Sequence, residues 1–85
     1  MELNYTSDQF MRGLLVQVQP LQADIIRTGH SAHLDADVHE DHISFSVTIF
    51  QDNAIVKSFD FSALDSEDEL FAQLKMLQAF IKNKL

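Results

Sequence analysis

The stretch LDADVHEDHISFSVTI, residues 34–49, decides the fold because apolar and polar residues alternate along it with a period of two. This period is typical of β-strands that have one face in a core and the other in water. The alternation is interrupted once, at Glu40-Asp41, so the stretch predicts two strands joined in a hairpin. If these two residues form the turn, Val38 lies opposite Ile43 and every apolar side chain of the hairpin points to one face.

A third strand is expected at residues 54–61, after a three-residue turn at residues 51–53 in which Asn53 can adopt the left-handed conformation. In this register Lys57 falls on the inward row, where its side chain has to reach water from the edge of the sheet. The apolar residues expected to point inward from this strand are Ile55, Phe59 and Phe61.

Helical periodicity precedes the strands. Apolar residues that recur every three or four positions predict a bent helix over residues 7–28, beginning at a capping box formed by Thr6 and Gln9. Pro20 removes a backbone donor and predicts a kink or break near its position. Gly29 is suited to end the helix in a left-handed conformation.

Helical periodicity also follows the strands. Ser66 and Glu69 are spaced as a second capping box, and the acidic first turn suits the positive end of the helix dipole. Lys82 and Lys84 suit its negative end. The apolar stripe of this helix consists of Leu70, Phe71, Leu74, Leu77, Ile81 and Leu85.

These elements predict an α+β domain of order α-β-β-β-α, a three-stranded antiparallel meander with two helices packed on one face. A chain of 85 residues supports one hydrophobic core, so residues 1–85 are expected to form a single domain. The second face of the sheet is left open to solvent or to a partner.

The charge of the chain argues against nucleic acid as a partner. It has 13 acidic and 6 basic side chains, for a net charge of −7 with histidine neutral. The order of elements resembles that of double-stranded RNA-binding domains, in which a Lys-rich start of the second helix grips phosphates. The corresponding stretch here, residues 65–69, reads DSEDE and would repel phosphates, so no nucleic acid is expected to bind.

Composition also bears on compartment and chemistry. The chain has no cysteine, which excludes disulfides, thiolate metal sites and a cysteine nucleophile. No stretch approaches the roughly 20 apolar residues that cross a bilayer, and the first ten residues lack the pattern of a secretory signal. We therefore expect a cytoplasmic protein without a membrane partner.

Residues 29–42 contain all four histidines and suggest a candidate metal site. Strand parity places three of them on the open side of the hairpin, where imidazole and carboxylate groups could bind zinc. The alternatives are a solvated polar face and a pH-responsive interface, because no recognised ligand spacing is present. The candidate metal ligands are His33, His39 and His42.

An open sheet face without a glycine-rich loop or nucleophile elbow predicts no catalysis, and nothing in the sequence calls for a cofactor. The same parity places an apolar cluster on the outer face, as expected of a contact surface. This cluster consists of Phe50, Ala54 and Val56. The predicted function is a small acidic interaction or accessory domain that forms a homodimer or binds a protein partner, with inhibition of a basic protein by nucleic-acid mimicry as one form of it. The alternative is a metal-binding protein.

Overall fold

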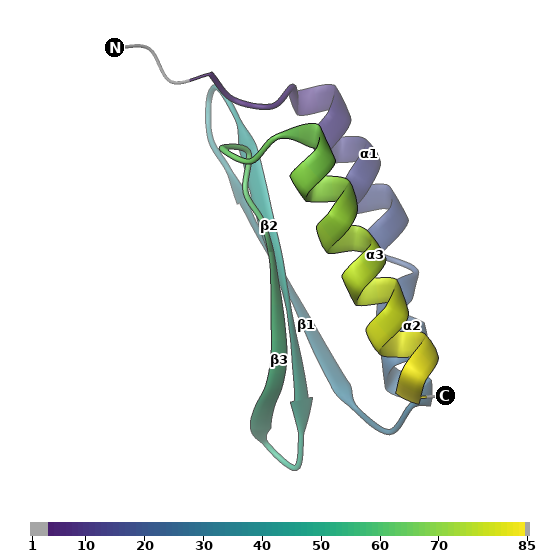
Figure 1. The fold of residues 1–85 in the computed structure, drawn as a ribbon. Helices are drawn as coiled ribbons and strands as arrows, with labels where there is room; N and C mark the ends of the chain where they lie inside the picture. The colour runs from purple at the N-terminus through teal and green to yellow at the C-terminus, as the bar shows by residue number, and fades with distance from the viewer. Residues whose placement is uncertain (1–3, 85) are drawn as a thin grey trace.

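Strands β1 (Ser31–Val38) and β2 (Ile43–Gln51) form the predicted antiparallel hairpin in the computed structural model, which describes residues 4–84 (Figure 1). Val38 lies opposite Ile43, and the pairing continues without interruption to the start of β1. The register predicted from the alternation is therefore confirmed, because shifting it by one residue would turn every apolar side chain of the hairpin to the wrong face.

The β1–β2 turn closes at Glu40-Asp41, with the His39 N–H donating to the His42 carbonyl at 2.9 Å. Neither turn residue has a positive φ, since Asp52 and Asn53 are the only non-glycine residues with one in the described chain. The loop therefore lacks the left-handed residues of the tight primed turns that usually join two strands.

Strand β3 (Ala54–Phe61) follows a turn of two residues, and the predicted three-residue turn is wrong. Asp52 and Asn53 have φ of 53° and 67°, and both residue types tolerate the left-handed region. If the strand pairing continued from this tight turn without a bulge, the phenylalanines of β3 would point away from the core. A bulge beside Phe50 adds one residue to β3 and restores their inward orientation.

The bulge changes the register expected for β3. Phe61 lies opposite Phe45 instead of Ile43, and Ile55 lies opposite Phe50 with 66% of its surface exposed. The prediction that Ile55 points into the core is therefore wrong.

Lys57 lies on the inward row, as predicted, and its partner there is the buried Ile49. Its side chain is exposed, with the ammonium nitrogen 5.7 Å from the centre of the Phe59 ring. The turn at residues 52–53 lies beyond the ends of the helices, so this part of the inward face is open to water (Figure 1).

The predicted bent helix is two helices, α1 (Asp8–Val18) and α2 (Leu21–Arg27). The helical hydrogen bonds do not continue through Pro20, because proline has no N–H to donate. Gly29 ends α2 with φ of 86°, as predicted.

The first cap differs from the prediction. The Ser7 hydroxyl accepts the Phe10 N–H at 3.2 Å, and the Thr6 hydroxyl instead donates to the carbonyl of Asp65 at 2.6 Å. Thr6 therefore ties the N-terminal segment to the loop before the last helix.

Helix α3 (Glu67–Lys84) begins at the predicted capping box. The Glu69 N–H donates to the Ser66 hydroxyl at 3.2 Å, and the Ser66 N–H donates to the Glu69 carboxylate at 3.3 Å. These two bonds satisfy backbone donors that a helix start otherwise leaves to water.

The three helices cover one face of the sheet, so the predicted α+β architecture is confirmed (Figure 1). The apolar stripe of α3 is narrower than predicted, because Phe71 is 43% exposed; Leu85 lies outside the described residues. The buried core consists of Met11, Leu14, Val18, Ile25, Ile43, Phe45, Val47, Ile49, Phe59, Phe61, Ala63, Leu70, Leu74, Leu77 and Ile81.

No residue of β1 contributes to this list. The alternation predicts that Ala36 and Val38 face the core, but both are exposed, Val38 at 71%. Helix α2 contacts β1, whereas α1 contacts β2 and α3 contacts β3. The inward side of β1 is therefore covered only in part.

Candidate functional site

The uncovered side of the sheet, here called the outer face, carries small polar and acidic side chains. Pairing places Asp35 of β1 and Asp60 of β3 on either side of Ser46 of β2. Asp37 lies opposite Ser44 in the next row. The outer face is formed by Ser31, His33, Asp35, Asp37, Ser44, Ser46, Thr48, Phe50, Ile55, Ser58, Asp60 and Ser62.

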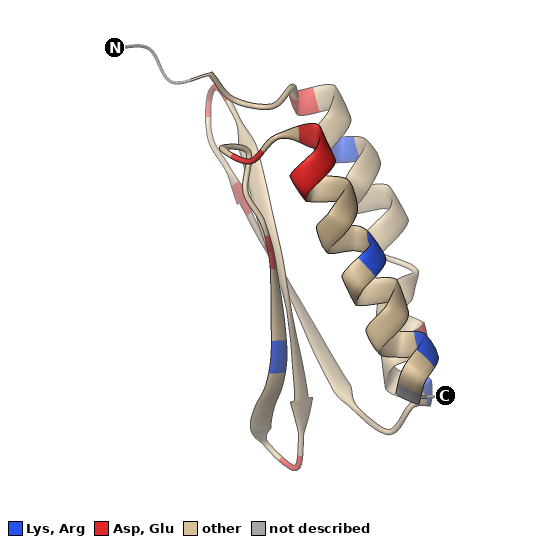
Figure 2. Ribbon diagram, in the orientation of Figure 1, with Lys and Arg blue, Asp and Glu red and all other residues tan. Residues whose placement is uncertain are grey.

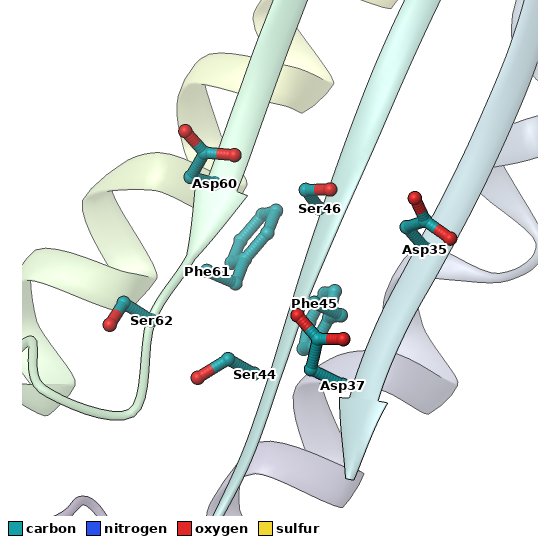
Figure 3. A pocket seen from close by; sticks show the side chains of 8 residues that line it. All are labelled: Asp35, Asp37, Ser44, Phe45, Ser46, Asp60, Phe61 and Ser62. Atoms are coloured by element: carbon teal, nitrogen blue, oxygen red, sulfur yellow. The ribbon is translucent and has the colours of Figure 1, made fainter.

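Part of the outer face forms an open hollow of about 180 Å³ (Figure 3). Three carboxylates and three hydroxyls surround it, above the rings of Phe45 and Phe61. The volume is below the roughly 300 Å³ at which pockets for small molecules begin. The acidic residues around the hollow are Asp35, Asp37 and Asp60.

Basic residues lie elsewhere. Figure 2 shows Lys and Arg mainly on the helices, whereas acidic residues gather on the part of the sheet near the β1–β2 turn and at the start of α3. Lys57, the basic residue of β3, lies on the inward row. None of the residues that form the outer face, all within the described chain, is Lys or Arg.

The structure brings together two of the three candidate metal ligands. The rings of His39 and His42 stack with centroids 4.4 Å apart, and Tyr5 stacks on the other side of His42 at 4.0 Å. His33 lies farther along β1, opposite Thr48, with its Nε2 3.5 Å from the Asp35 carboxylate. The contribution of Tyr5 could not be predicted from the sequence, because the contact joins the N-terminal segment to a distant turn.

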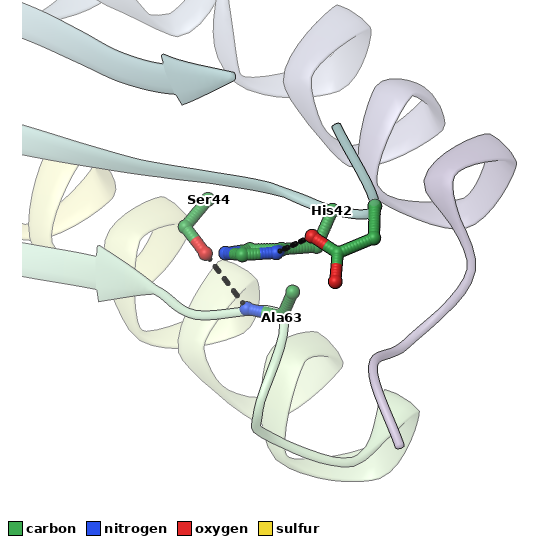
Figure 4. Close-up of polar contacts among 4 residues, drawn as sticks. His42, Ser44 and Ala63 are labelled. Carbon is green, nitrogen blue, oxygen red and sulfur yellow. Dashed lines mark hydrogen bonds and ion pairs between the residues drawn. The ribbon is translucent and has the colours of Figure 1, made fainter. Parts of the chain in front are cut away.

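His42 also contacts the turn. Its Nδ1 lies 2.8 Å from a carboxylate oxygen of Asp41, and Figure 4 shows this contact beside the bond from the Ala63 N–H to the Ser44 hydroxyl. The hydrogen bond from His42 lowers the pKa of Asp41 below its usual value. Because the pKa is lowered in the folded state, the contact stabilises the fold at neutral pH, and this contribution is lost as the pH falls through the lowered pKa.

The fourth histidine has a structural role. His30 is buried, its Nδ1 lies 2.7 Å from the Thr28 hydroxyl, and its ring packs edge-on against Phe80. The Thr28 hydroxyl donates to the Ile25 carbonyl, so its oxygen is free to accept from the imidazole. His30 therefore packs the connection between α2 and β1 against α3.

Within residues 4–84, no three His, Asp or Glu side chains are arranged to hold a metal ion. We predict that zinc will leave the melting temperature unchanged, because a ligand stabilises a fold only by binding the native state, to an extent set by the ratio of its concentration to its dissociation constant. The measurement is a thermal melt across a zinc titration, with the His39→Ala/His42→Ala double variant as the control. A saturable rise that the double variant abolishes would contradict this expectation.

The predicted apolar cluster changes composition in the structure. Phe50 is half-buried on the outer face, and its partner there is Ile55. Ala54 lies opposite Gln51, on the side of the inward row, so the prediction that Ala54 belongs to the outer face is wrong. Val56 is the residue that the bulge adds to β3, and it is 40% exposed. The bulge was absent from the sequence prediction, which is why Ile55 was missed.

None of the helices in the described part of the chain combines the length and the apolar content needed to cross a bilayer. Comparison with protein-family models, with curated proteins and with solved structures finds no match to this chain.

Proposed function

We propose that this protein is a non-catalytic interaction domain of the cytoplasm that binds a basic protein through the outer face of its sheet. The observation that carries the proposal is the uncovered outer face, where Asp35, Asp37 and Asp60 surround an open hollow with no lysine or arginine among its residues. Complementary charge accelerates association and selects the partner. A surface rich in Lys and Arg is the chemistry that this face fits.

The chemistry of the hollow supports binding over catalysis. A hydroxyl nucleophile requires a base within hydrogen-bonding distance. The Ser44 hydroxyl accepts the Ala63 N–H, and no hydrogen bond joins a histidine to a hydroxyl of the hollow in the described residues. The hollow is also open and small for a substrate.

The same charges oppose nucleic acid as a ligand. Phosphate backbones are bound by lysine and arginine, and three carboxylates would repel them. A partner protein that itself binds nucleic acid would present the basic surface that this face fits, so inhibition by mimicry is one form of the proposed function.

The test compares two variants that remove the same three negative charges. Asp35→Asn/Asp37→Asn/Asp60→Asn neutralises the outer face, and Glu40→Gln/Asp52→Asn/Glu67→Gln neutralises exposed positions elsewhere. Each form is immobilised, exposed to lysate of the native host at low salt and eluted with rising salt. We expect a basic protein to be captured by the wild type and by the control variant, and to bind the outer-face variant at least about tenfold more weakly once purified.

Equal capture by both variants would assign the interaction to another surface. Capture that resists salt would also contradict the proposal, because contacts between exposed charges are screened by salt.

A further inference from the structure

We infer that the free edge of β1 pairs with β1 of a second copy of this chain, antiparallel, so that the two sheets become one. This interface goes beyond the proposed function, because it joins the backbone edges of two sheets; of the three acidic residues around the hollow, Asp60 on β3 lies away from it. The order β1-β2-β3 leaves β1 and β3 as the two edges, and the choice between them follows from their residues.

Strand β3 carries two features that oppose edge pairing. A bulge interrupts it next to the turn, and Lys57 places a charge on its inward row. Natural sheets use bulges and inward charges to prevent edge-to-edge association. Strand β1 has neither feature: its pairing with β2 is regular throughout, it contains no proline, and its inward row is apolar.

The hydrogen bond at the β1–β2 turn shows which backbone groups of β1 are free. The His39 N–H bonds to the His42 carbonyl, which makes these two residues a hydrogen-bonded pair. Such pairs alternate along an antiparallel ladder, so every second residue of β1 directs its N–H and C=O away from β2. The residues whose backbone groups face the free edge are Ala32, Leu34, Ala36 and Val38.

The apolar core stops one strand short of this edge. Phe45 and Ile43 of β2 are 4% and 5% exposed, whereas their partners on β1, Ala36 and Val38, are exposed. A strand added beside β1 would continue the inward apolar row past the point where this chain alone ends it.

The outer side of β1 selects the register of the pair. With the two-fold axis at Leu34, His33 lies opposite Asp35 of the second copy, and this contact occurs twice by symmetry. With the axis at Asp35, Asp35 lies opposite Asp35 of the second copy. With the axis at Ala36, Asp35 lies opposite Asp37 of the second copy. Like charges directly opposite each other destabilise a sheet, so the axis at Leu34 is favoured over the axes at Asp35 and Ala36.

The same register is favourable on the inward side. Leu34 meets Leu34 of the second copy, and Ala32 meets Ala36 of the second copy. All of these side chains are apolar. A contact in which each strand presents the same surface to the other is the usual geometry of a two-fold dimer.

Cysteine cross-linking tests the axis directly, because the chain has no cysteine of its own. Directly opposite residues of a hydrogen-bonded pair have Cα atoms about 5.5 Å apart, which is within the range that a disulfide spans. We expect Leu34→Cys to form a covalent dimer under mild oxidation. The matched control, Ser58→Cys on the edge strand β3, is expected to stay monomeric.

Ala36→Lys tests the edge without a cross-link, since it gives β1 the inward lysine that β3 already has. Ala36 is exposed, so the variant is expected to keep the circular dichroism of the wild type. By sedimentation equilibrium we expect the wild type to dimerise with rising concentration and Ala36→Lys to weaken the dimer at least tenfold.

A charge exchange tests the register. His33→Asp places two carboxylates opposite each other at both symmetric contacts and is expected to weaken the dimer, and the double variant His33→Asp/Asp35→His is expected to restore it.

A wild type that is monomeric at every concentration would overturn the inference. So would a dimer that cross-links through Ser58→Cys or that Val56→Glu disrupts while Ala36→Lys does not. Ala36→Lys leaves the acidic residues of the outer face unchanged. Whether this variant captures a basic protein therefore tests the proposed function independently of the dimer.

Discussion

Phe61→Ala is expected to lower the free energy of unfolding of this protein by about 3–5 kcal/mol. Phe61 is fully buried, and its ring stacks on Phe45 with centroids 4.7 Å apart. Truncating a buried phenylalanine costs about 3–5 kcal/mol, because transfer free energy is lost and a cavity remains. Small domains are stable by about 5–15 kcal/mol in total. The variant therefore loses a large part of the free energy of unfolding.

Phe71→Ala is the matched control, since it removes the same side chain from a position that is 43% exposed on α3. In the wild type, the Phe71 ring makes an edge-on contact with Phe10, with the ring centroids 5.2 Å apart. We expect it to cost less than half as much as Phe61→Ala, measured as the shift in free energy of unfolding by urea denaturation. Equal losses from the two variants would contradict the position assigned to β3, because Phe61 reaches the core only through its bulge.

The two glycines are expected to respond to alanine in opposite directions. Gly29 has φ of 86°, and a Cβ added there would meet no atom within 4 Å. The cost of Gly29→Ala is therefore the backbone cost of a left-handed residue, about 1–2 kcal/mol. Gly13 lies inside α1, and a Cβ there also meets nothing within 4 Å. Gly13→Ala should stabilise the fold by about 0.5–1 kcal/mol, because glycine is entropically unfavourable in a helix.

Thermal or urea denaturation of both variants provides the measurement, and each variant is the control for the other. Neither substitution introduces a contact, so the difference in sign isolates backbone conformation. Destabilisation by both substitutions would show that Gly13 is required for a close approach that the structure does not contain.

The candidate site was predictable in part. Alternation placed His33, Asp35 and Asp37 on the side of β1 away from the core, and this was sufficient to locate the outer face. Asp60 was not singled out, although its place next to the inward Phe59 was the available signal. The grouping of Asp60 with Asp35 across Ser46 depends on the register of β3, which a single bulge determines.

The arrangement of the histidines was also predictable in part. His39 and His42 flank a turn, so their proximity follows from the hairpin register. The distance of His33 from them also follows from strand geometry, because an extended strand rises by about 3.3 Å per residue. The stacking of the Tyr5 ring on His42 could not be foreseen, because it depends on how the N-terminal segment lies against the β1–β2 turn.

Local sequence patterns were sufficient to predict the β1–β2 hairpin, its register and the capped start of α3. These features follow from contacts between residues close in the chain, where side-chain period and capping geometry allow one arrangement. The extent to which helices cover β1 depends instead on contacts between elements that are far apart in the chain. Helices α1 and α2 cross a twisted sheet and contact β2 and the start of β1, so Val38 stays exposed although its pattern is that of a core residue. Burial depends on the path of elements far apart in the sequence, and alternation specifies only which face a side chain takes.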